Sequence, residues 1–152
     1  MDIREASIAD IPQLQEIRNS VRENILSNPA LIGKSDYKKF ITSKGKGWVC
    51  VDEKIITGFA IVDLKGHNIW ALFVRPGSER QGIGIRLHET MMTWYFGQTR
   101  HTIWLSTAPG TRAEQFYRAA GWIETGTHGN NEIKFEMTYD NWLLKQEPER
   151  NH

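Results

Sequence analysis

The chain contains little cysteine, no long apolar run and almost no net charge. Cys50 is the only cysteine among its 152 residues, which excludes an internal disulfide. No apolar stretch approaches the roughly 18 residues of a membrane-spanning segment, and the first residues lack the pattern of a secretory signal peptide. The length suits one globular domain, which we expect to be cytoplasmic.

The charges nearly cancel, with 19 Lys and Arg against 18 Asp and Glu and no basic block. Binding to nucleic acid or to an anionic membrane needs clustered positive charge, so neither partner is expected. The five histidines show no metal-ligand spacing, and Cys50 lies in an apolar run typical of a buried strand. We therefore expect no metal and no covalent cysteine intermediate.

Hydrophobic periodicity predicts a mixed α/β domain. Strands are expected at residues 2–6, 48–51, 55–64, 68–74, 102–107, 122–126 and 132–139. Helices are expected at residues 11–25, 35–42, 83–96 and 111–120. This order favours antiparallel hairpins at both ends, and the helical crossover after Val74 allows a parallel pair with the strand that ends at Thr107.

Two of the expected helices begin with capping patterns. Ser7 and Asp10 form a capping-box-like pair before the first helix, and Thr111 and Glu114 form a capping box at the start of the last one. Gly121 is expected to end that last helix. The last helix is therefore bounded at both ends by local signals.

The loop between Val74 and Ile83 is the most informative segment. Gly82 and Gly84 have no Cβ to obstruct a phosphate, so successive N–H groups and the positive end of the helix dipole can hold a pyrophosphate. Further donors stand nearby at Arg80, Gln81 and Arg86. The loop therefore predicts an anion site at the start of a helix.

Other phosphate motifs do not fit this loop. A Rossmann fingerprint needs a third glycine where Leu87 stands, and the Gly-Lys-Ser/Thr of a P-loop is absent. A Gly-x-Gly pair alone is also compatible with a tight loop that binds nothing.

Two blocks of the sequence resemble the GNAT (GCN5-related N-acetyltransferase) superfamily. The first block has the family's Val-x-Pro, Gly-x-Gly and early leucine at Val74, Pro76, Gly82, Gly84 and Leu87. The second has its Ala-x-x-Phe-Tyr and Gly-aromatic pattern at Ala113, Phe116, Tyr117, Gly121 and Trp122. Both stand in family order at family spacing, and a weaker likeness extends from Asp2 to about Tyr139.

The resemblance implies a GNAT-like α/β fold, with a central, mostly antiparallel sheet, flanking helices and a splayed parallel pair at the acyl-CoA site. The acetyltransferase domain would occupy residues 1–146 and leave residues 147–152 as a polar tail. The implied function is transfer of an acetyl group from acetyl-CoA to a primary amine, which attacks the thioester directly. The amine acceptor could be a small molecule or a protein amine.

The resemblance also assigns roles to individual residues. The implied acetyl-CoA contacts are Phe73, Val74, Arg80, Gln81, Gly82, Ile83, Gly84, Ile85, Arg86 and Phe116. Main-chain N–H groups around Phe73 and Val74 would stabilise the oxyanion. Tyr117 is the implied general acid, because a phenol with a pKa of about 10 can donate toward a thiolate whose conjugate acid is near ~8.5.

Two positions depart from the family pattern. Glu79 stands where Gln or Arg is usual, so a phosphate contact is lost unless Arg80 or Gln81 replaces it. Gly110 stands where an Asn often contacts the CoA arm.

No general base is evident, because the strand from Asn68 to Val74 contains no acid. His67, Glu23 and Ser106 are three weak candidates, each with an ordinary structural explanation. Acceptor contacts are expected instead from Tyr37 and Phe40. Aromatic packing explains the tryptophans of the expected strands, of which one or two could line the acceptor site: Trp48, Trp70, Trp104 and Trp122.

Three alternatives stay open. The enzyme could use a longer acyl chain, which alters pocket volume rather than motif. The domain could be a non-catalytic acyl-CoA-binding sensor or interaction module of the same fold, or its loop could bind a nucleotide phosphate instead. Edge strands and exposed aromatic residues would also allow a homodimer.

Overall fold

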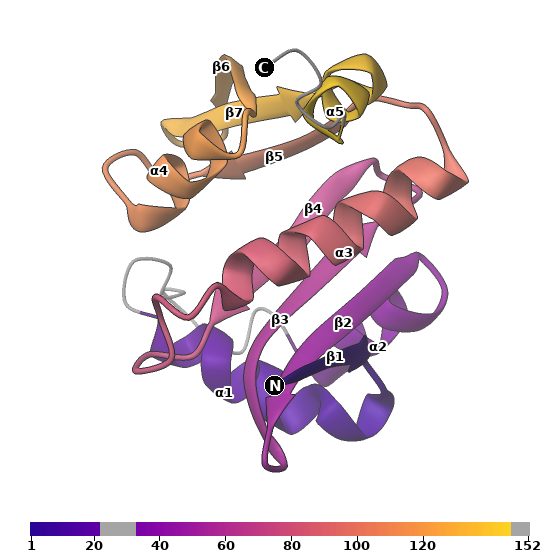
Figure 1. The fold of residues 1–152 in the computed structure, drawn as a ribbon, viewed down its shortest axis with the longest axis vertical. Coiled ribbons are helices and arrows are strands. Elements are labelled where there is room, and N and C mark those ends of the chain that lie inside the picture. Colours follow the sequence, from indigo (N-terminus) through magenta and orange to yellow (C-terminus); the bar gives the residue numbers. More distant parts are fainter. Residues whose placement is uncertain (22–32, 147–152) are drawn as a thin grey trace, which may run out of the picture. The chain divides into compact units, whose positions relative to one another are not determined.

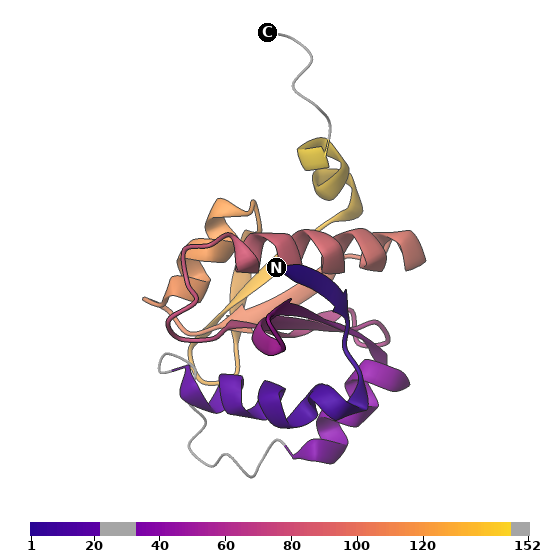
Figure 2. The same cartoon turned by 60° about the horizontal axis from the view of Figure 1, so that its bottom comes forward.

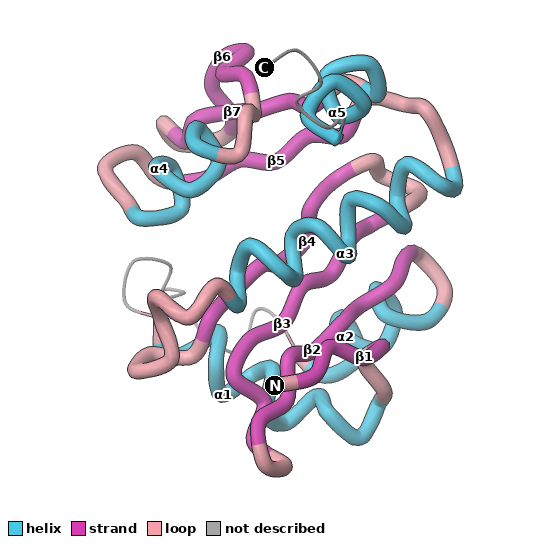
Figure 3. The backbone as a smooth tube through the Cα atoms, in the orientation of Figure 1, coloured by secondary structure: helices cyan, strands magenta, loops and turns pink. Residues whose placement is uncertain are grey.

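The computed structural model describes residues 1–21 and 33–146. The chain divides into two compact units, Met1–Tyr95 and Phe96–His152. Figure 1 follows the chain through both units, and Figure 3 separates helices from strands.

The described residues of the first unit form four strands, whose order across the sheet is the same as their order along the chain. They are β1 (Asp2–Glu5), β2 (Gly45–Asp52), β3 (Ile55–Asp63) and β4 (Asn68–Val74). Each strand pairs antiparallel with the next, so the predicted meander of β2, β3 and β4 is confirmed (Figure 3). A bulge interrupts the β3–β4 register between Ile61 and Val62 and leaves Trp70 as an extra residue on β4.

Helices cover both faces of these four strands. A short 3₁₀ turn, η1 (Ile8–Asp10), leads into α1 (Ile11–Ser20), and α2 (Lys34–Thr42) precedes β2. The long helix α3 (Ile83–Gln98) follows β4. Figure 2 shows α1 and α2 on one face of the strands and the start of α3 on the other.

The core beneath α1 and α2 is almost entirely aliphatic and aromatic. Its buried members are Ile11, Leu14, Ile17, Tyr37, Ile41, Val49, Ile56, Phe59, Ile61 and Ala71. The spacing of three along α1 (Ile11, Leu14, Ile17) and of two from Phe59 to Ile61 on β3 belongs to the periodicity that predicted both kinds of element.

The first helix is shorter than expected. The periodicity predicted a helix as far as Ile25, but α1 ends at Ser20 and Val21 is extended, with φ −80° and ψ 110°. The Ser20 hydroxyl donates to the Ile17 carbonyl at 2.8 Å. It therefore competes with main-chain N–H groups for that carbonyl in the last turn of the helix. The rest of the expected helix lies outside the described residues.

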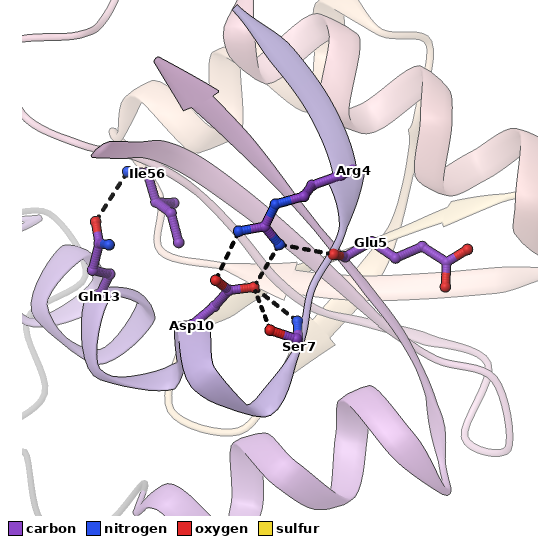
Figure 4. A network of polar contacts seen from close by, with 6 residues as sticks. All are labelled: Arg4, Glu5, Ser7, Asp10, Gln13 and Ile56. Atoms are coloured by element: carbon purple, nitrogen blue, oxygen red, sulfur yellow. Dashed lines mark hydrogen bonds and ion pairs between the residues drawn. The ribbon is translucent and has the colours of Figure 1, made fainter. Parts of the chain in front are cut away.

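A polar network joins β1 to the start of α1 (Figure 4). The Arg4 guanidinium donates two hydrogen bonds to the Asp10 carboxylate, at 2.8 and 2.9 Å. Asp10 also accepts from the Ser7 N–H at 2.8 Å, and this bond is one half of the Ser7–Asp10 capping box predicted from the sequence. In the same view the Gln13 side chain accepts from the Ile56 N–H at 3.0 Å and ties α1 to β3.

The second unit contains β5 (Ile103–Thr107), α4 (Arg112–Ala119), β6 (Ile123–His128), β7 (Glu132–Met137) and α5 (Tyr139–Gln146). Strand β7 lies between β5 and β6 and pairs antiparallel with both, which confirms the predicted closing hairpin. Buried aromatic residues of this unit include Tyr117, Trp122, Phe135 and Trp142. The expected mixed α/β class, with mostly antiparallel strands and flanking helices, is confirmed.

Helix α4 has the expected ends, with one difference. The Thr111 hydroxyl accepts from the Glu114 N–H at 3.2 Å, but the Glu114 carboxylate accepts from the Gly110 N–H rather than from Thr111. Gly121 has φ +92°, and the N–H of Trp122 reaches back to the Tyr117 carbonyl at 3.0 Å. This is a Schellman ending, so the predicted glycine stop is confirmed.

Helix α5 was not predicted, because residues 132–139 were interpreted as a strand that continued to Tyr139. The strand instead ends at Met137, and the Thr138 hydroxyl accepts from the Asn141 N–H at 3.1 Å as a helix N-cap. Trp142 of α5 then packs against Phe96, with ring centroids 6.1 Å apart. Trp122, expected within a strand, lies one residue before β6.

Candidate functional site

The end of β4 is fixed by Arg75. Its N–H donates to the Thr57 carbonyl at 2.7 Å, and its Nε donates to the Ile56 carbonyl at 2.9 Å. Its Nη1 forms an ion pair with Glu16 of α1. The loop that follows β4 therefore starts from a point held by both β3 and α1.

The loop itself winds through left-handed conformations. Gly77, Arg80 and Gly82 have φ of +94°, +67° and +76°, whereas Gln81 keeps a negative φ. Alternation of hand between Arg80 and Gly82 turns successive N–H groups toward the same side, as in anion-binding nests. Gly82 is therefore required by its own backbone conformation, independently of any ligand.

Helix α3 begins directly after this turn. Its first main-chain bond runs from the Arg86 N–H to the Gly82 carbonyl at 3.1 Å. The N–H groups of Ile83, Gly84 and Ile85 precede that bond and so have no partner within the helix. They stand at the positive end of the helix dipole, which attracts an anion.

The start of α3 is seated against β3 by a glycine that the sequence interpretation did not single out. A Cβ placed on Gly58 would lie 2.9 Å from Cγ2 of Ile83 and 3.1 Å from Cδ1 of Leu87. Both of these helix residues are buried, at 1% and 0% exposure. A glycine inside an otherwise apolar strand was the available signal for such a close approach.

The side chains of the loop differ in their surroundings. Arg80, Gln81 and Arg86 are exposed, as a solvent-facing phosphate site requires, and Ile85 is 61% exposed. The Glu79 carboxylate accepts from the Gly77 N–H at 2.6 Å. Glu79, the acid that departs from the family pattern, is thus hydrogen-bonded to the main chain of its own turn.

The two β4 residues expected to grip the acetyl group lie opposite β3. Phe73 pairs with Phe59 and Val74 pairs with Gly58 in the strand register. The Phe73 and Phe59 rings are 5.7 Å apart, so the Phe73 side chain belongs to the face covered by α1 and α2.

Tyr117, the expected general acid, is buried within the second unit at 6% exposure. Its ring lies 5.3 Å from Phe116, 5.6 Å from Trp122 and 6.4 Å from Phe135. Burial raises the pKa of its phenol well above the ordinary value, so Tyr117 is protonated throughout the physiological range.

Two of the three weak base candidates have partners of their own. His67 Nδ1 lies 2.9 Å from the hydroxyl of Tyr95, and burial raises the pKa of Tyr95 to about 12. The Ser106 hydroxyl donates to the Glu132 carboxylate at 2.8 Å. Glu23 lies outside the described residues.

Three of the four tryptophans are explained by packing. Trp48 contacts Trp94, Trp104 contacts His128 and Trp122 contacts Tyr117, at ring distances of 5.6, 4.9 and 5.6 Å. Trp70 instead joins the two aromatic residues expected on the acceptor side. Its ring lies 5.0 Å from Tyr37 and 4.5 Å from Phe40.

Neither a metal cluster nor a membrane-spanning helix is found in the described ranges, 1–21 and 33–146. No group of three or more His, Cys, Asp or Glu side chains within them could hold a metal ion. Within the same residues, no helix combines the length and apolar character needed to cross a membrane.

Solved structures match nearly the whole chain. The ribosomal-protein-alanine N-acetyltransferase of Brucella melitensis is 20% identical with a TM-score of 0.72, over 91% of this chain and 99% of that one. The PaiA N-acetyltransferase of Thermoplasma acidophilum, solved with coenzyme A, is 16% identical with a TM-score of 0.77, over 91% and 98%. YncA of Salmonella typhimurium, solved with acetyl-CoA, is 16% identical with a TM-score of 0.73, over 92% and 94%.

At these identities the solved structures establish the fold, which confirms the expected GNAT-like architecture. The comparison with curated proteins found no match. A family model described as an acetyltransferase (GNAT) domain matches residues 43–124, which include β4, the glycine loop and Tyr117. Because this match spans more than half of the sequence, the chain belongs to the GNAT acetyltransferase family.

Proposed function

We propose that this protein is an acetyl-CoA-dependent N-acetyltransferase that acts on a primary amine. The observation that carries the proposal is the turn from Gly82 to Arg86, where the N–H groups at the start of α3 come before the first hydrogen bond within the helix. The turn lies inside the segment matched by the family model. Two structures of the same fold, from Thermoplasma acidophilum and Salmonella typhimurium, hold coenzyme A and acetyl-CoA.

In this proposal the first turn of α3 binds the pyrophosphate. The N–H groups of Ile83, Gly84 and Ile85 donate to it, and the helix dipole supports its charge. The exposed side chains of Arg80, Gln81 and Arg86 supply further donors. The hydrogen bond from Gly77 to Glu79 offsets the departure from the family pattern, because it engages the acid within its own turn.

The acetyl end of the cofactor is proposed to bind at the end of β4. Main-chain groups of Phe73 and Val74 would hold the thioester and stabilise the oxyanion, while Phe116 would contact the pantetheine arm. Only the backbone of β4 is recruited, so the packing of Phe73 against Phe59 is compatible with this role.

The reaction follows from the chemistry of a thioester and an amine. The neutral amine attacks the carbonyl carbon, a C–N bond forms, and the C–S bond breaks as CoA leaves. Attack leaves the nitrogen positively charged in the tetrahedral intermediate, where its pKa is far below the ~10.4 of a free alkylammonium, so its proton passes to water. We assign none of the described residues as a general base for this step.

Tyr117 is proposed to donate a hydrogen bond to the departing sulfur. Its buried phenol has a raised pKa, whereas the CoA thiol ionises near ~8.5, so the phenol keeps its proton. Stabilisation by a donated hydrogen bond is therefore a better description of its role than complete proton transfer.

A non-catalytic acyl-CoA-binding domain is the second candidate function. It is favoured by one observation, namely that His67 and Ser106 are each hydrogen-bonded to a partner in the fold. It predicts acyl-CoA binding without acetyl transfer to any amine. A longer acyl chain also stays open, and titration with acyl-CoAs of increasing length tests it.

Calorimetric titration tests the proposed cofactor. Acetyl-CoA and CoA should each bind with a Kd of roughly 1–100 µM, whereas ATP and NAD should bind far more weakly. Binding of a nucleotide without binding of CoA would contradict the proposal.

We also propose a cytoplasmic location, a homodimer and a single domain over residues 1–146. Light scattering coupled to gel filtration measures the mass of the particle in solution. A mass close to 17.5 kDa, that of one chain, would exclude the dimer.

A further inference from the structure

An arginine with two unpartnered nitrogens lies among the aromatic residues of the first unit. Arg18 is on α1, and its Nε and Nη1 atoms are buried without a hydrogen-bond partner. Within residues 1–21 and 33–146 no ion pair includes this guanidinium. A buried charge without a partner is costly, so its presence needs an explanation.

Aromatic rings form the immediate surroundings of this guanidinium. Its central carbon lies 4.8 Å from the ring centre of Phe73 and 5.9 Å from that of Trp70. Tyr37 and Phe40 of α2 pack against the Trp70 ring, at 5.0 and 4.5 Å. We call these five residues the Arg18 cluster.

The bulge in β4 makes this arrangement possible. Residues 70 and 73 have opposite parity along a regular strand and would point to opposite faces of the sheet. The extra residue at position 70 breaks that alternation, and both rings contact the same guanidinium. The bulge thus brings the rings of Trp70 and Phe73 to the same guanidinium, an arrangement that a regular strand would not allow.

The rings compensate the charge only in part. A cation over an aromatic face gains far less than the loss of hydration from two guanidinium nitrogens. Burial accordingly lowers the pKa of Arg18, and Tyr37 offsets part of that effect. A bound anion would supply what the rings do not.

We propose that Arg18 binds the carboxylate of the acceptor, so that the acceptor is an amine that also carries a carboxylate. This inference rests on the proposed function. A carboxylate accepts two parallel hydrogen bonds from one edge of a guanidinium, either from Nε and Nη2 or from Nη1 and Nη2, so it would give a partner to one of the two unpartnered nitrogens. A phosphate of higher charge calls for several cations. The surrounding rings suit the apolar part of such an acceptor.

Phe73 links the two halves of the proposed site. Its side chain contacts Arg18, and its main chain is the proposed grip for the acetyl group. An acceptor held by Arg18 would therefore present an amine that is separated from its carboxylate by a short spacer. An α-amino acid has that form.

Matched pairs of amines test the proposal through acetylation. Each pair differs only in the carboxylate: L-phenylalanine and phenethylamine, L-leucine and isoamylamine, L-lysine and cadaverine. CoA release should show a kcat/KM at least about tenfold higher for the amino acid in one or more pairs, since a charge-assisted hydrogen bond accounts for such a factor. Equal values in every acetylated pair, or a preference for the decarboxylated amine, would overturn the proposal.

Variants of Arg18 separate the acceptor from the cofactor. Arg18→Gln should abolish the preference for the amino acid and leave the Kd for acetyl-CoA unchanged. Arg100→Gln, an exposed arginine of the second unit, is the matched control and should keep the preference. If the unaltered protein does not bind acetyl-CoA, the proposed function is refuted, and not the role of Arg18 alone.

Arg18→Met tests the unpaired charge without any substrate. Removal of a buried, unpaired guanidinium should raise Tm by about 2–4 °C, because an apolar side chain of similar length packs among the same rings. A lower Tm would mean that Arg18 already has a structural partner, and it would overturn the proposal.

A measurement of amino-acid binding to Arg18 tests the proposal even if none of these amines is acetylated. In protein labelled with ¹⁵N-arginine, the Nε–H signal that is absent from Arg18→Gln belongs to Arg18. It should shift on addition of one or more of the three amino acids and not with their decarboxylated partners. No shift with any amino acid, or a shift with O-phosphoethanolamine alone, would contradict a carboxylate site.

Discussion

At the scale of single residues, the two glycines of the loop do different things. Gly82 has φ +76° and is needed for the turn itself, so any substitution there strains the backbone as well as the site. Gly84 lies within α3 and has no such requirement from its backbone. Position 84 is therefore the place where ligand binding can be altered without disturbing the turn.

Gly84→Asp should abolish binding of acetyl-CoA while the protein stays folded. The new carboxylate would stand among the N–H groups proposed to hold the pyrophosphate and would repel it. Calorimetry gives the affinity and circular dichroism the fold. Gly97→Asp, at the other end of the same helix, is the control and should bind normally, since a Cβ at Gly97 meets no neighbouring atom. Normal binding by a folded Gly84→Asp protein would refute the assigned loop.

Tyr117→Phe should lower kcat by about 10²-fold, because one hydrogen-bond donor to a developing charge is removed. Affinity for CoA should change little, and the rate of the unaltered enzyme should not fall through ionisation of Tyr117 below about pH 10, since burial raises its pKa. Steady-state kinetics across pH measures both. An unchanged kcat would exclude Tyr117 from the chemistry.

At the scale of elements, local patterns predicted most helices and strands but not the details that shape the site. The glycine loop followed from spacing, and the caps of α4 followed from Thr111 and Gly121. The bulge at Trp70 carries no glycine or proline as a marker, and the contact of Arg18 with Phe73 joins residues 55 positions apart. Such features depend on tertiary packing, which periodicity along the chain does not contain.

The network around Asp10 makes an element-scale prediction about pH. The Arg4 guanidinium holds the pKa of the Asp10 carboxyl below its ordinary value, and the Ser7 N–H adds to the effect. A lowered pKa in the folded state means that the contribution to stability is complete above about pH 4, the ordinary value, and is lost as pH falls through the folded-state pKa.

Asp10→Asn should therefore lower the free energy of unfolding by about 1–2 kcal/mol at neutral pH. The figure is modest because Arg4 is half exposed and its ion pair is screened by water. Urea denaturation from pH 7 down to pH 3 should show the difference from the unaltered protein shrink below about pH 4. Asp2→Asn, on the exposed part of β1, serves as control. A constant difference at all pH values would exclude a role for the Asp10 charge.

At the scale of the whole molecule, the family was recognisable although the three solved relatives named above share only 16–20% of their sequence with this chain. Several of the residues that carry the resemblance have backbone roles in this fold, such as Gly82 and Gly121 at positive φ. The residues expected to recognise the acceptor, including Tyr37 and Phe40, belong to no family motif. This is why the sequence predicted the cofactor but not the acceptor.

Transfer of the acetyl group is the central claim, and mass spectrometry tests it most directly. The purified protein is incubated with acetyl-CoA and the three pairs of amines, with Tyr117→Phe in parallel, while released CoA thiol is measured. We predict an acetylated amine that forms in proportion to CoA, and much more slowly with the variant. Binding of acetyl-CoA without any acetylated product, across this set and a wider set of small-molecule and peptide amines, would contradict the claim and favour an acyl-CoA-binding domain.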